Sequence, residues 1–288
     1  MRAKSVAVVN LKGGVGKTTL TVALAEGSAV TGHRTLIVDL DPQANSSSIV
    51  VGGDVAPNEM PWRKDMTFAS FIRDRLARKT DDIDLYTTKD LISFTEGETV
   101  SLLSGAPQMR RLERQLLGRS GATLASTAAQ MDAAIESVLA RAHETYDLVL
   151  FDCPPGLSLL TEAALRQCDL ILLPTSPSPM GIEGLTEFAK YLREDLQISS
   201  LTDKLFAFLS MMTNTRLAES YASLVRSQPH LLNPLFNVFE TEFRLRVAFQ
   251  EAMQRDQPVQ LLQQRWGAEA DAVLAATAEL WSYLRRTV

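Results

Sequence analysis

The sequence has 288 residues, of which 45% are hydrophobic and 22% are charged, with a formal net charge of −5. This composition supports a hydrophobic core, and the negative charge argues against a protein that coats nucleic acid through its overall field. No apolar run approaches the roughly 20 residues that a membrane span requires, and the two cysteines form no metal-ligand pattern. At this length the chain could form one large domain or two small ones, and we expect it in the cytoplasm and without stable membrane insertion.

The first predicted elements are a buried strand over residues 6–10, a glycine-rich turn and a helix over residues 18–31. Glycines allow the backbone amides of such a turn to surround an anion at the positive end of the helix. Lys17 would place its charge on the outer phosphates of a nucleotide, and the Thr18 hydroxyl would reach Mg²⁺. The predicted cofactor-binding residues of this segment are Gly13, Gly14, Val15, Gly16, Lys17, Thr18 and Thr19.

The turn departs from the ordinary phosphate-loop pattern G-x-x-x-x-G-K-S/T, because Leu11 occupies the first glycine position and a second lysine, Lys12, follows it. This arrangement resembles the deviant Walker A signature of the ParA/MinD family of ATPases. The resemblance implies a single domain with a P-loop NTPase fold over residues 1–288, ATP and Mg²⁺ as cofactors, and a homodimer that closes on ATP. It also implies that Lys12 reaches the phosphates of the partner subunit as a catalytic group, in the manner of an arginine finger.

A second strand, over residues 35–41, completes a βαβ unit with parallel strands. Asp39 and Asp41 lie at its carboxyl end, where ligands bind in such sheets. The run Asp-Leu-Asp-Pro-Gln resembles the second motif of the family, which implies that Asp41 orients the attacking water and supports the Mg²⁺ shell. The alternative is that Asp41 is a turn residue or helix N-cap before Pro42.

An apolar strand over residues 146–152 ends in Asp152 and is followed by Cys153-Pro-Pro-Gly. An acid at the end of such a strand, after a phosphate loop, is typical of a Walker B carboxylate that holds the Mg²⁺ shell. The segment also resembles the third motif of the family. We expect Cys153 to be a buried structural cysteine, because no His or Lys is placed by the sequence to activate it.

The remaining periodicity predicts further helices and strands around these motifs. We expect helices over residues 67–79, 122–143, 181–194 and 268–284, a helix rich in Arg and Leu after Pro107, and strands over residues 83–86, 99–103, 169–175 and 205–211. Together with the first elements they predict an α/β fold, a mostly parallel twisted sheet with helices on both faces. In the family, the loop after the last of these strands closes over adenine and ribose, which makes Asn214 a candidate base contact; the alternative is a turn-forming Asn.

Two arginines, Arg244 and Arg246, lie between a predicted strand that starts near residue 237 and a helix that follows. In chromosome-type relatives this region meets the DNA backbone, so both are candidate DNA-binding residues; the alternative is a solvated charged face. The resemblance implies a positioning ATPase that binds DNA non-specifically in its ATP state, associates with the nucleoid and is stimulated by a ParB-like or cargo-adaptor protein. Two alternatives are a MinD-like membrane-surface switch and a reductase component of the nitrogenase iron-protein kind.

Overall fold

The computed structural model describes residues 2–52, 60–198, 201–228, 234–254 and 260–286. Within these ranges one sheet has the strand order β3-β4-β2-β5-β1-β6-β7-β8. All neighbouring strands are parallel except β3 and β4, which confirms the expected α/β fold with a mostly parallel sheet. The strands are β1 (Lys4–Val8), β2 (Thr35–Asp39), β3 (Thr87–Ser93), β4 (Thr99–Leu103), β5 (Leu148–Asp152), β6 (Leu170–Thr175), β7 (Leu205–Leu209) and β8 (Asn237–Val238).

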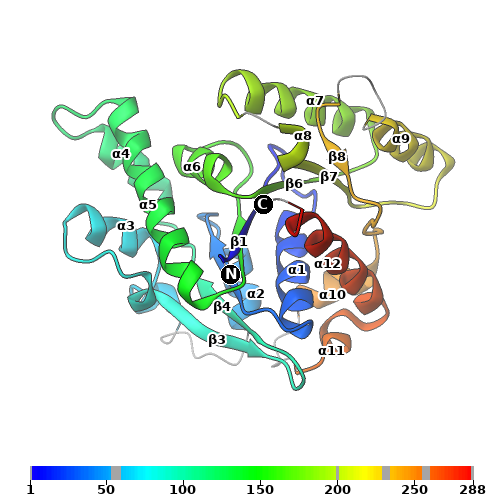
Figure 1. The fold of residues 1–288 in the computed structure, drawn as a ribbon, viewed down its shortest axis with the longest axis horizontal. Helices are drawn as coiled ribbons and strands as arrows, with labels where there is room; N and C mark the ends of the chain where they lie inside the picture. The colour runs from blue at the N-terminus through cyan, green and yellow to red at the C-terminus, as the bar shows by residue number, and fades with distance from the viewer. Residues whose placement is uncertain (1, 53–59, 199–200, 229–233, 255–259, 287–288) are drawn as a thin grey trace.

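Helices cover both faces of this sheet (Figure 1). One face packs against α3 (Phe68–Leu76), α4 (Met109–Leu117), α5 (Leu124–Thr145), α6 (Leu159–Gln167), α7 (Pro179–Glu194), α8 (Leu201–Lys204) and α9 (Arg216–Ser227). The other packs against α1 (Lys17–Val30), α2 (Asn45–Val51), α10 (Val247–Ala252), α11 (Leu262–Trp266) and α12 (Ala270–Leu284). Successive residues of β5 show the division, since Phe151 belongs to the first core and Leu150 to the second. The central strands are therefore apolar on both faces.

The order of the strands brings the sequence motifs to one edge of the sheet. Strand β5 pairs with both β1 and β2, and Asp152 is in register with Val8 on one side and Asp39 on the other. The turn after β1, the acids after β2 and the acid that ends β5 therefore meet at the carboxyl edge.

The prediction of a strand over residues 83–86 is wrong. Residues Ile83–Leu85 form a 3₁₀ turn, η2, in which the Asp82 side chain accepts a 3.0 Å hydrogen bond from the Asp84 amide. The strand of this region is β3, which begins at Thr87 and pairs antiparallel with β4 across a register shift. The buried residues of β3, Thr87 and Ile92, are five positions apart, so the segment lacks the period of two that would identify a strand.

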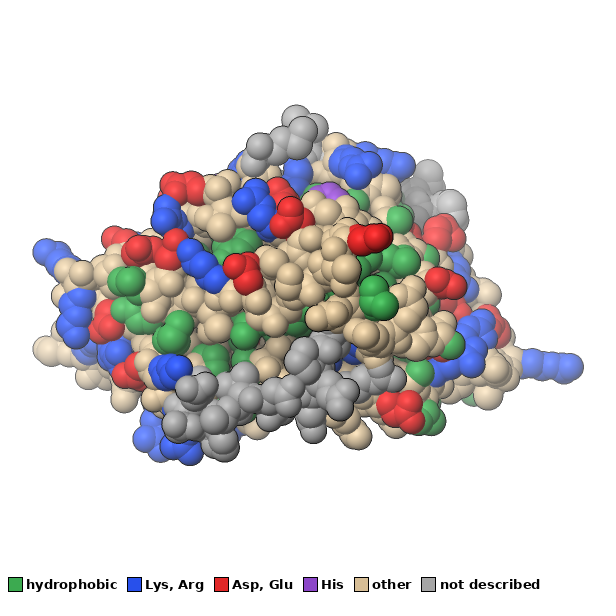
Figure 2. Space-filling model, turned by 90° about the horizontal axis from the view of Figure 1, so that it is seen from below, with side chains coloured by type: hydrophobic (Ala, Val, Ile, Leu, Met, Phe, Trp, Pro, Cys, Tyr) green, Lys and Arg blue, Asp and Glu red, His purple; other side chains and the backbone are tan. Residues whose placement is uncertain are grey.

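Short 3₁₀ turns also occur at η1 (Pro61–Arg63) and η4 (Gly267–Glu269). On the surface, acidic and basic side chains are interspersed over the face that Figure 2 shows. In the part of the chain that the structure describes, no helix combines the length and apolar character needed to cross a bilayer.

Candidate active site

The turn between β1 and α1 is shaped to surround an anion. Gly14 and Gly16 have φ values of +75° and +85°, a left-handed conformation that a residue with a Cβ rarely adopts. A Cβ built on Gly13 or Gly14 would meet no atom within 4 Å, so the space beside these two glycines is open. Gly16 is the N-cap of α1, so the free amides of the first helical turn face this opening.

Lys17 is buried at the start of α1, and its ammonium lies over the turn. Its Nζ donates a 2.8 Å hydrogen bond to the Lys12 carbonyl. Burial lowers the pKa of Lys17, and the nearby carboxylates of Asp152 and Asp41 oppose this shift. The geometry places a cation where the outer phosphates of a nucleotide would lie.

The Thr18 hydroxyl points to the carboxylate that ends β5. It donates a 3.0 Å hydrogen bond to Asp152 Oδ2, while the Thr21 hydroxyl donates to the other oxygen at 3.3 Å. Burial raises the pKa of Asp152, and the adjacent Asp39 adds to the shift. Hydroxyl and carboxylate oxygens are the ligands that Mg²⁺ prefers, and the cation would relieve the buried charge.

Among the described residues, no group of three or more His, Cys, Asp or Glu forms a complete metal site. A Mg²⁺ ion would therefore need oxygens of a nucleotide or of water beside those of Thr18 and the acids, as is usual for nucleotide-bound Mg²⁺. The residues present fit this partial donor set.

Asp39 holds the loop after β2 in place through buried hydrogen bonds, a role that was not predicted from the sequence. It is fully buried and accepts hydrogen bonds from the amides of Asp41 and Ser47, both at 3.0 Å, and from the Ser47 hydroxyl at 2.6 Å. The Ser47 hydroxyl in turn accepts a 3.0 Å bond from the Gly105 amide. Asp41 itself caps its own turn, because its carboxylate accepts a 2.8 Å bond from the Gln43 amide. The turn role and the site role of Asp41 are therefore compatible.

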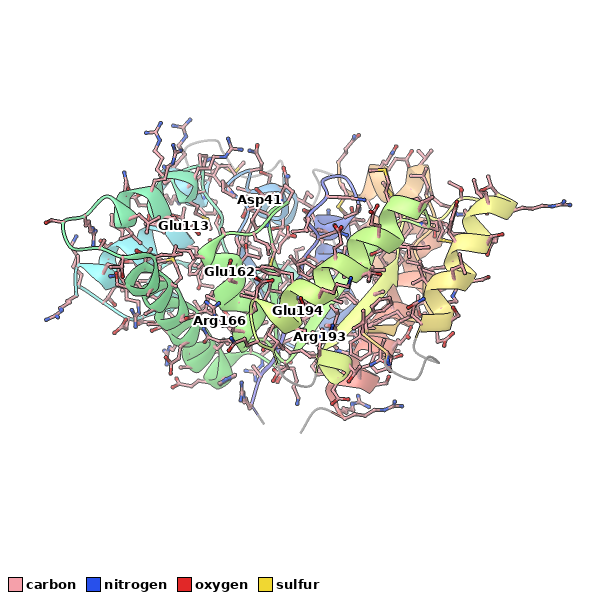
Figure 3. All side chains as sticks on the ribbon, turned by 90° about the horizontal axis from the view of Figure 1, so that it is seen from above. Asp41, Glu113, Glu162, Arg166, Arg193 and Glu194 are labelled. Carbon is pink, nitrogen blue, oxygen red and sulfur yellow. The ribbon has the colours of Figure 1, made fainter. Side chains whose placement is uncertain are left out.

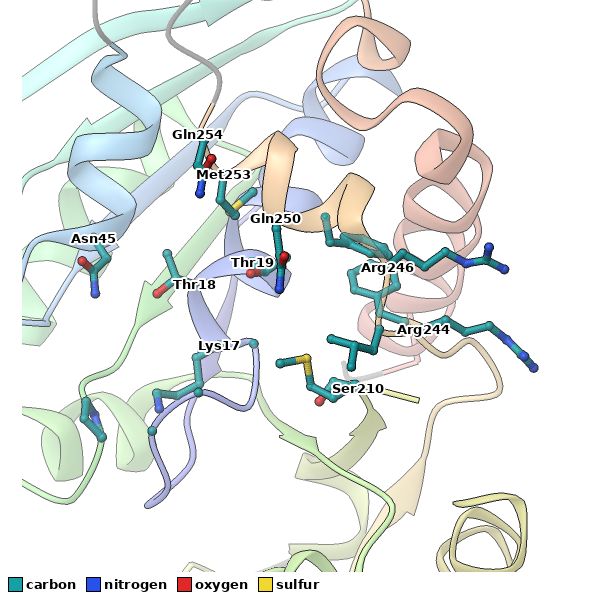
Figure 4. Close-up of a pocket in the computed structure, with 18 of the residues that line it drawn as sticks. Lys17, Thr18, Thr19, Asn45, Ser210, Arg244, Arg246, Gln250, Met253 and Gln254 are labelled. Carbon is teal, nitrogen blue, oxygen red and sulfur yellow. The ribbon is translucent and has the colours of Figure 1, made fainter. Parts of the chain in front are cut away.

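A cleft of about 770 Å³ opens at this edge, and we call it the nucleotide cleft (Figure 4). Of the residues predicted from the sequence, it is lined by Gly13, Gly14, Gly16, Lys17, Thr18, Thr19, Asp41, Arg244 and Arg246. Sequence reasoning missed the far end, which is lined by Ser210, Met211, Phe243, Leu245, Phe249, Gln250, Met253 and Gln254. An apolar wall with a few amides suits a flat heterocyclic base.

Val15 and Asp152 sit behind the cleft and do not line it. The Val15 carbonyl accepts a 2.8 Å hydrogen bond from the Ser210 hydroxyl at the end of β7. This bond ties the phosphate turn to the strand that leads into the apolar end. No local signal in the sequence marks Ser210, because the two residues meet only through the fold.

Asn214 is exposed and is not among the residues that line the nucleotide cleft. Its side-chain oxygen accepts a hydrogen bond from Arg244, which also pairs with Glu242 at 3.1 Å and Glu219 at 3.7 Å. Arg246 pairs with Glu269 at 3.3 Å. Both guanidinium groups point away from Lys17 in Figure 4. Base contact by Asn214 and DNA contact by the arginines stay predictions.

Lys12 lies on the outer side of the turn. Its amide donates a 2.9 Å bond to the Asn10 side chain, and its ammonium donates to the Met180 carbonyl in the first turn of α7. Within its own subunit the ammonium therefore faces α7. Contact with a second subunit stays a prediction.

The cysteines are both buried, and burial raises the pKa of Cys153 and that of Cys168. The thiols are therefore protonated at neutral pH, as expected of structural cysteines.

Comparison with known proteins agrees with this geometry. A family model, AAA_31 (AAA domain), matches residues 3–205. The sporulation initiation inhibitor protein Soj of Bacillus subtilis is 32% identical over 73% of this chain and 75% of its own length, and the chromosome-partitioning ATPase Soj of Treponema pallidum is 30% identical over 77% of both chains. The ATP complex of a McdA variant from Cyanothece superposes with a TM-score of 0.68 at 15% identity and covers 97% of both chains. The chain therefore belongs to the ParA/MinD family of P-loop ATPases.

Proposed function

We propose that this chain is an ATP-hydrolysing switch that positions or partitions an intracellular cargo. The observation that carries the proposal is the phosphate turn with two lysines, in which Lys17 faces the cleft and the Thr18 hydroxyl bonds to Asp152. The names of the Soj relatives, one of them a chromosome-partitioning ATPase, support the same class of function.

The residues of the site divide the work of phosphoryl transfer to water. Lys17 and the amides of the turn would bind the phosphates, and Thr18, Asp152 and Asp41 would hold Mg²⁺ when it is bound. The ion would neutralise charge on the phosphates. Asp41 orients the attacking water, and Lys12 moves from α7 to the phosphates of a second subunit. The closed state is then a homodimer, formed only with ATP.

In this proposal residues 1–288 act as one domain, and the ATP dimer binds DNA non-specifically on the nucleoid. A ParB-like or cargo-adaptor protein stimulates slow hydrolysis and so releases the dimer. Arg244 and Arg246 are the candidate DNA contacts, and they must exchange their present acidic partners for phosphates.

Binding to non-specific duplex DNA tests the proposal, measured with ATP, ADP or no nucleotide across a salt series. We expect binding only with ATP, and an affinity that falls steeply with salt because backbone contacts release counterions. Replacing Arg244 and Arg246 by Ala together should lower the salt slope by about 2. Lys17→Ala, which removes the phosphate-facing cation, is the control that should abolish the ATP effect.

DNA binding that is absent while ATP dimers still form would contradict the positioning mechanism. Anionic liposomes then replace DNA in the same assay, since binding to them would favour the membrane-surface alternative. A wild-type chain that neither binds ATP nor dimerises with it would contradict the proposed ATP-dependent switch.

A further inference from the structure

A second cavity, of about 350 Å³, lies on the α4 side of the catalytic loops, and we call it the α4 cavity. Its apolar lining comes from four separate parts of the chain and is buried: Leu40, Met109, Leu112, Met131 and Leu160. An apolar hollow of this size accepts one or two large apolar side chains, and flexible Met side chains adapt to their shape.

The α4 cavity and the nucleotide cleft share the walls between them. Asp41 lines the nucleotide cleft, whereas the next residue, Pro42, lines the α4 cavity. In the same way Pro155 lines the cleft and Pro154 lines the cavity. An occupant of the α4 cavity would therefore contact both the loop that carries Asp41 and the loop that follows Asp152.

The rim of the α4 cavity is basic. Arg110 and Arg114 line it, are exposed, and stand one turn apart on α4. Neither makes a side-chain ion pair within the ranges that the structure describes. Glu113 also lines the cavity, but its carboxylate accepts a 3.2 Å hydrogen bond from the Leu160 amide at the start of α6. Figure 3 shows Glu113 and Asp41 toward the same edge of the molecule.

We propose that the α4 cavity is the docking site for an acidic, apolar segment of the protein that stimulates hydrolysis. Apolar side chains of the segment fill the cavity, and its carboxylates pair with Arg110 and Arg114, whose planar guanidinium groups suit bidentate contacts. The inference rests on the proposed function only for the effect on hydrolysis. DNA is the less suitable occupant, because phosphate contacts require charge but make no use of a buried apolar hollow.

Fluorescence anisotropy of labelled synthetic peptides tests the docking site on the full chain with ATP and Mg²⁺. The first peptide alternates Glu with Leu, the second replaces every Glu by Lys, and the third replaces every Leu by Ser. We expect saturable binding of the first alone, together with a severalfold rise in ATP hydrolysis. The double variant Arg110→Glu/Arg114→Glu should weaken that binding roughly tenfold or more, because it sets like charges against the peptide.

The matched control is Arg111→Glu, which reverses an exposed charge on the same helix. Arg111 lines a different groove, between α3 and α4, so peptide binding should stay unchanged. Two results would overturn the proposal and indicate a diffuse basic surface for DNA. One is that Arg111→Glu weakens peptide binding as much as the double variant does. The other is that the peptide with Ser in place of Leu binds as tightly as the first peptide. Anisotropy measures peptide binding independently of ATP hydrolysis. A chain that binds the first peptide but hydrolyses no ATP would therefore contradict the proposed function and still support the docking site.

Discussion

The Thr18 hydroxyl donates a 3.0 Å hydrogen bond to Asp152 and so joins the start of α1 to the end of β5. The carboxylate is fully buried, and burial raises its pKa because the charged form loses water. The acid that would hold Mg²⁺ therefore destabilises the fold when no cation is bound.

Replacing Asp152 by Asn should separate stability from function. We expect Asp152→Asn to raise the unfolding midpoint without nucleotide at neutral pH, because the wild type must either bury the charge of Asp152 or take up a proton on folding, and Asn requires neither. Hydrolysis of ATP with Mg²⁺ should fall about a hundredfold or more, because a metal contact is worth several kcal/mol in the transition state. Asp195→Asn, at the exposed end of α7, is the control and should change neither quantity. A lower unfolding midpoint of Asp152→Asn would contradict the predicted gain in stability.

The backbone of Lys12 holds the phosphate turn of its own subunit, whereas its ammonium bonds to the Met180 carbonyl, which it can exchange for another partner. The Lys12 carbonyl accepts from Lys17 Nζ, and the Lys12 amide donates to the Asn10 side chain. Both interactions survive truncation of the side chain. We expect Lys12→Ala to bind ATP like the wild type but to hydrolyse it about a thousandfold more slowly.

Single-turnover hydrolysis and ATP-dependent dimerisation measure the two steps of the Lys12 prediction separately. Lys190→Ala, an exposed lysine on α7, is the control that should leave both steps unchanged. If Lys12→Ala formed ATP dimers and hydrolysed at the wild-type rate, a trans role of Lys12 would be wrong.

Residues that act within one short segment could be predicted from the sequence. The phosphate turn combines a buried strand, glycines and Lys17 within a few positions, and Asp152 ends an apolar run. These patterns also predict the parallel core of the sheet, because its central strands are buried on both faces.

Contacts between distant segments could not be predicted in this way. The apolar end of the nucleotide cleft combines Met211 with Phe249 and Met253, residues far apart in the sequence that only the fold brings together. Asn214, predicted from its place in a loop, bonds to Arg244 instead of lining the cleft. The edge strand β3 escaped detection because one of its faces is only partly buried.

Gly105 allows Asp39, at the end of β2, and Asp41, just after it, to approach the chain after β4. A Cβ at this position would lie 2.7 Å from the Asp41 carbonyl and 2.9 Å from Asp39 Cγ. Because backbone and a buried side chain must shift, we expect Gly105→Ala to lower the unfolding free energy by about 1–3 kcal/mol. It should also slow hydrolysis more than it weakens ATP binding, because Asp41 is displaced while the phosphate turn is not.

Urea unfolding, ATP binding and single-turnover hydrolysis check the Gly105 prediction. Wild-type hydrolysis in a variant that is less stable would show that Asp41 tolerates the shift. Unchanged stability would show that the loop after β4 moves aside without cost.

Glu26 should make stability depend on pH through the packing of α1 against α11. Its carboxylate is fully buried, 2.6 Å from Arg265 and 2.7 Å from the Trp266 indole nitrogen. Burial raises the pKa of Glu26 from 4.5 to about 7, against the opposing effects of Arg265 and Trp266. The folded state then holds the proton more tightly than the unfolded state. The stability contributed by protonation is complete below the unfolded pKa and is lost as pH rises through about 7.

Glu26→Gln keeps the shape of the side chain and removes its titration. We expect the variant to match the wild type near pH 4.5 and to be more stable by about 2–3 kcal/mol near pH 8, since one pKa unit corresponds to about 1.4 kcal/mol. Urea unfolding across this pH range measures the difference, with the exposed Glu136→Gln as a control that should follow the wild type. A Glu26→Gln variant that is less stable than the wild type near pH 8 would show instead that the pair with Arg265 outweighs the cost of burial.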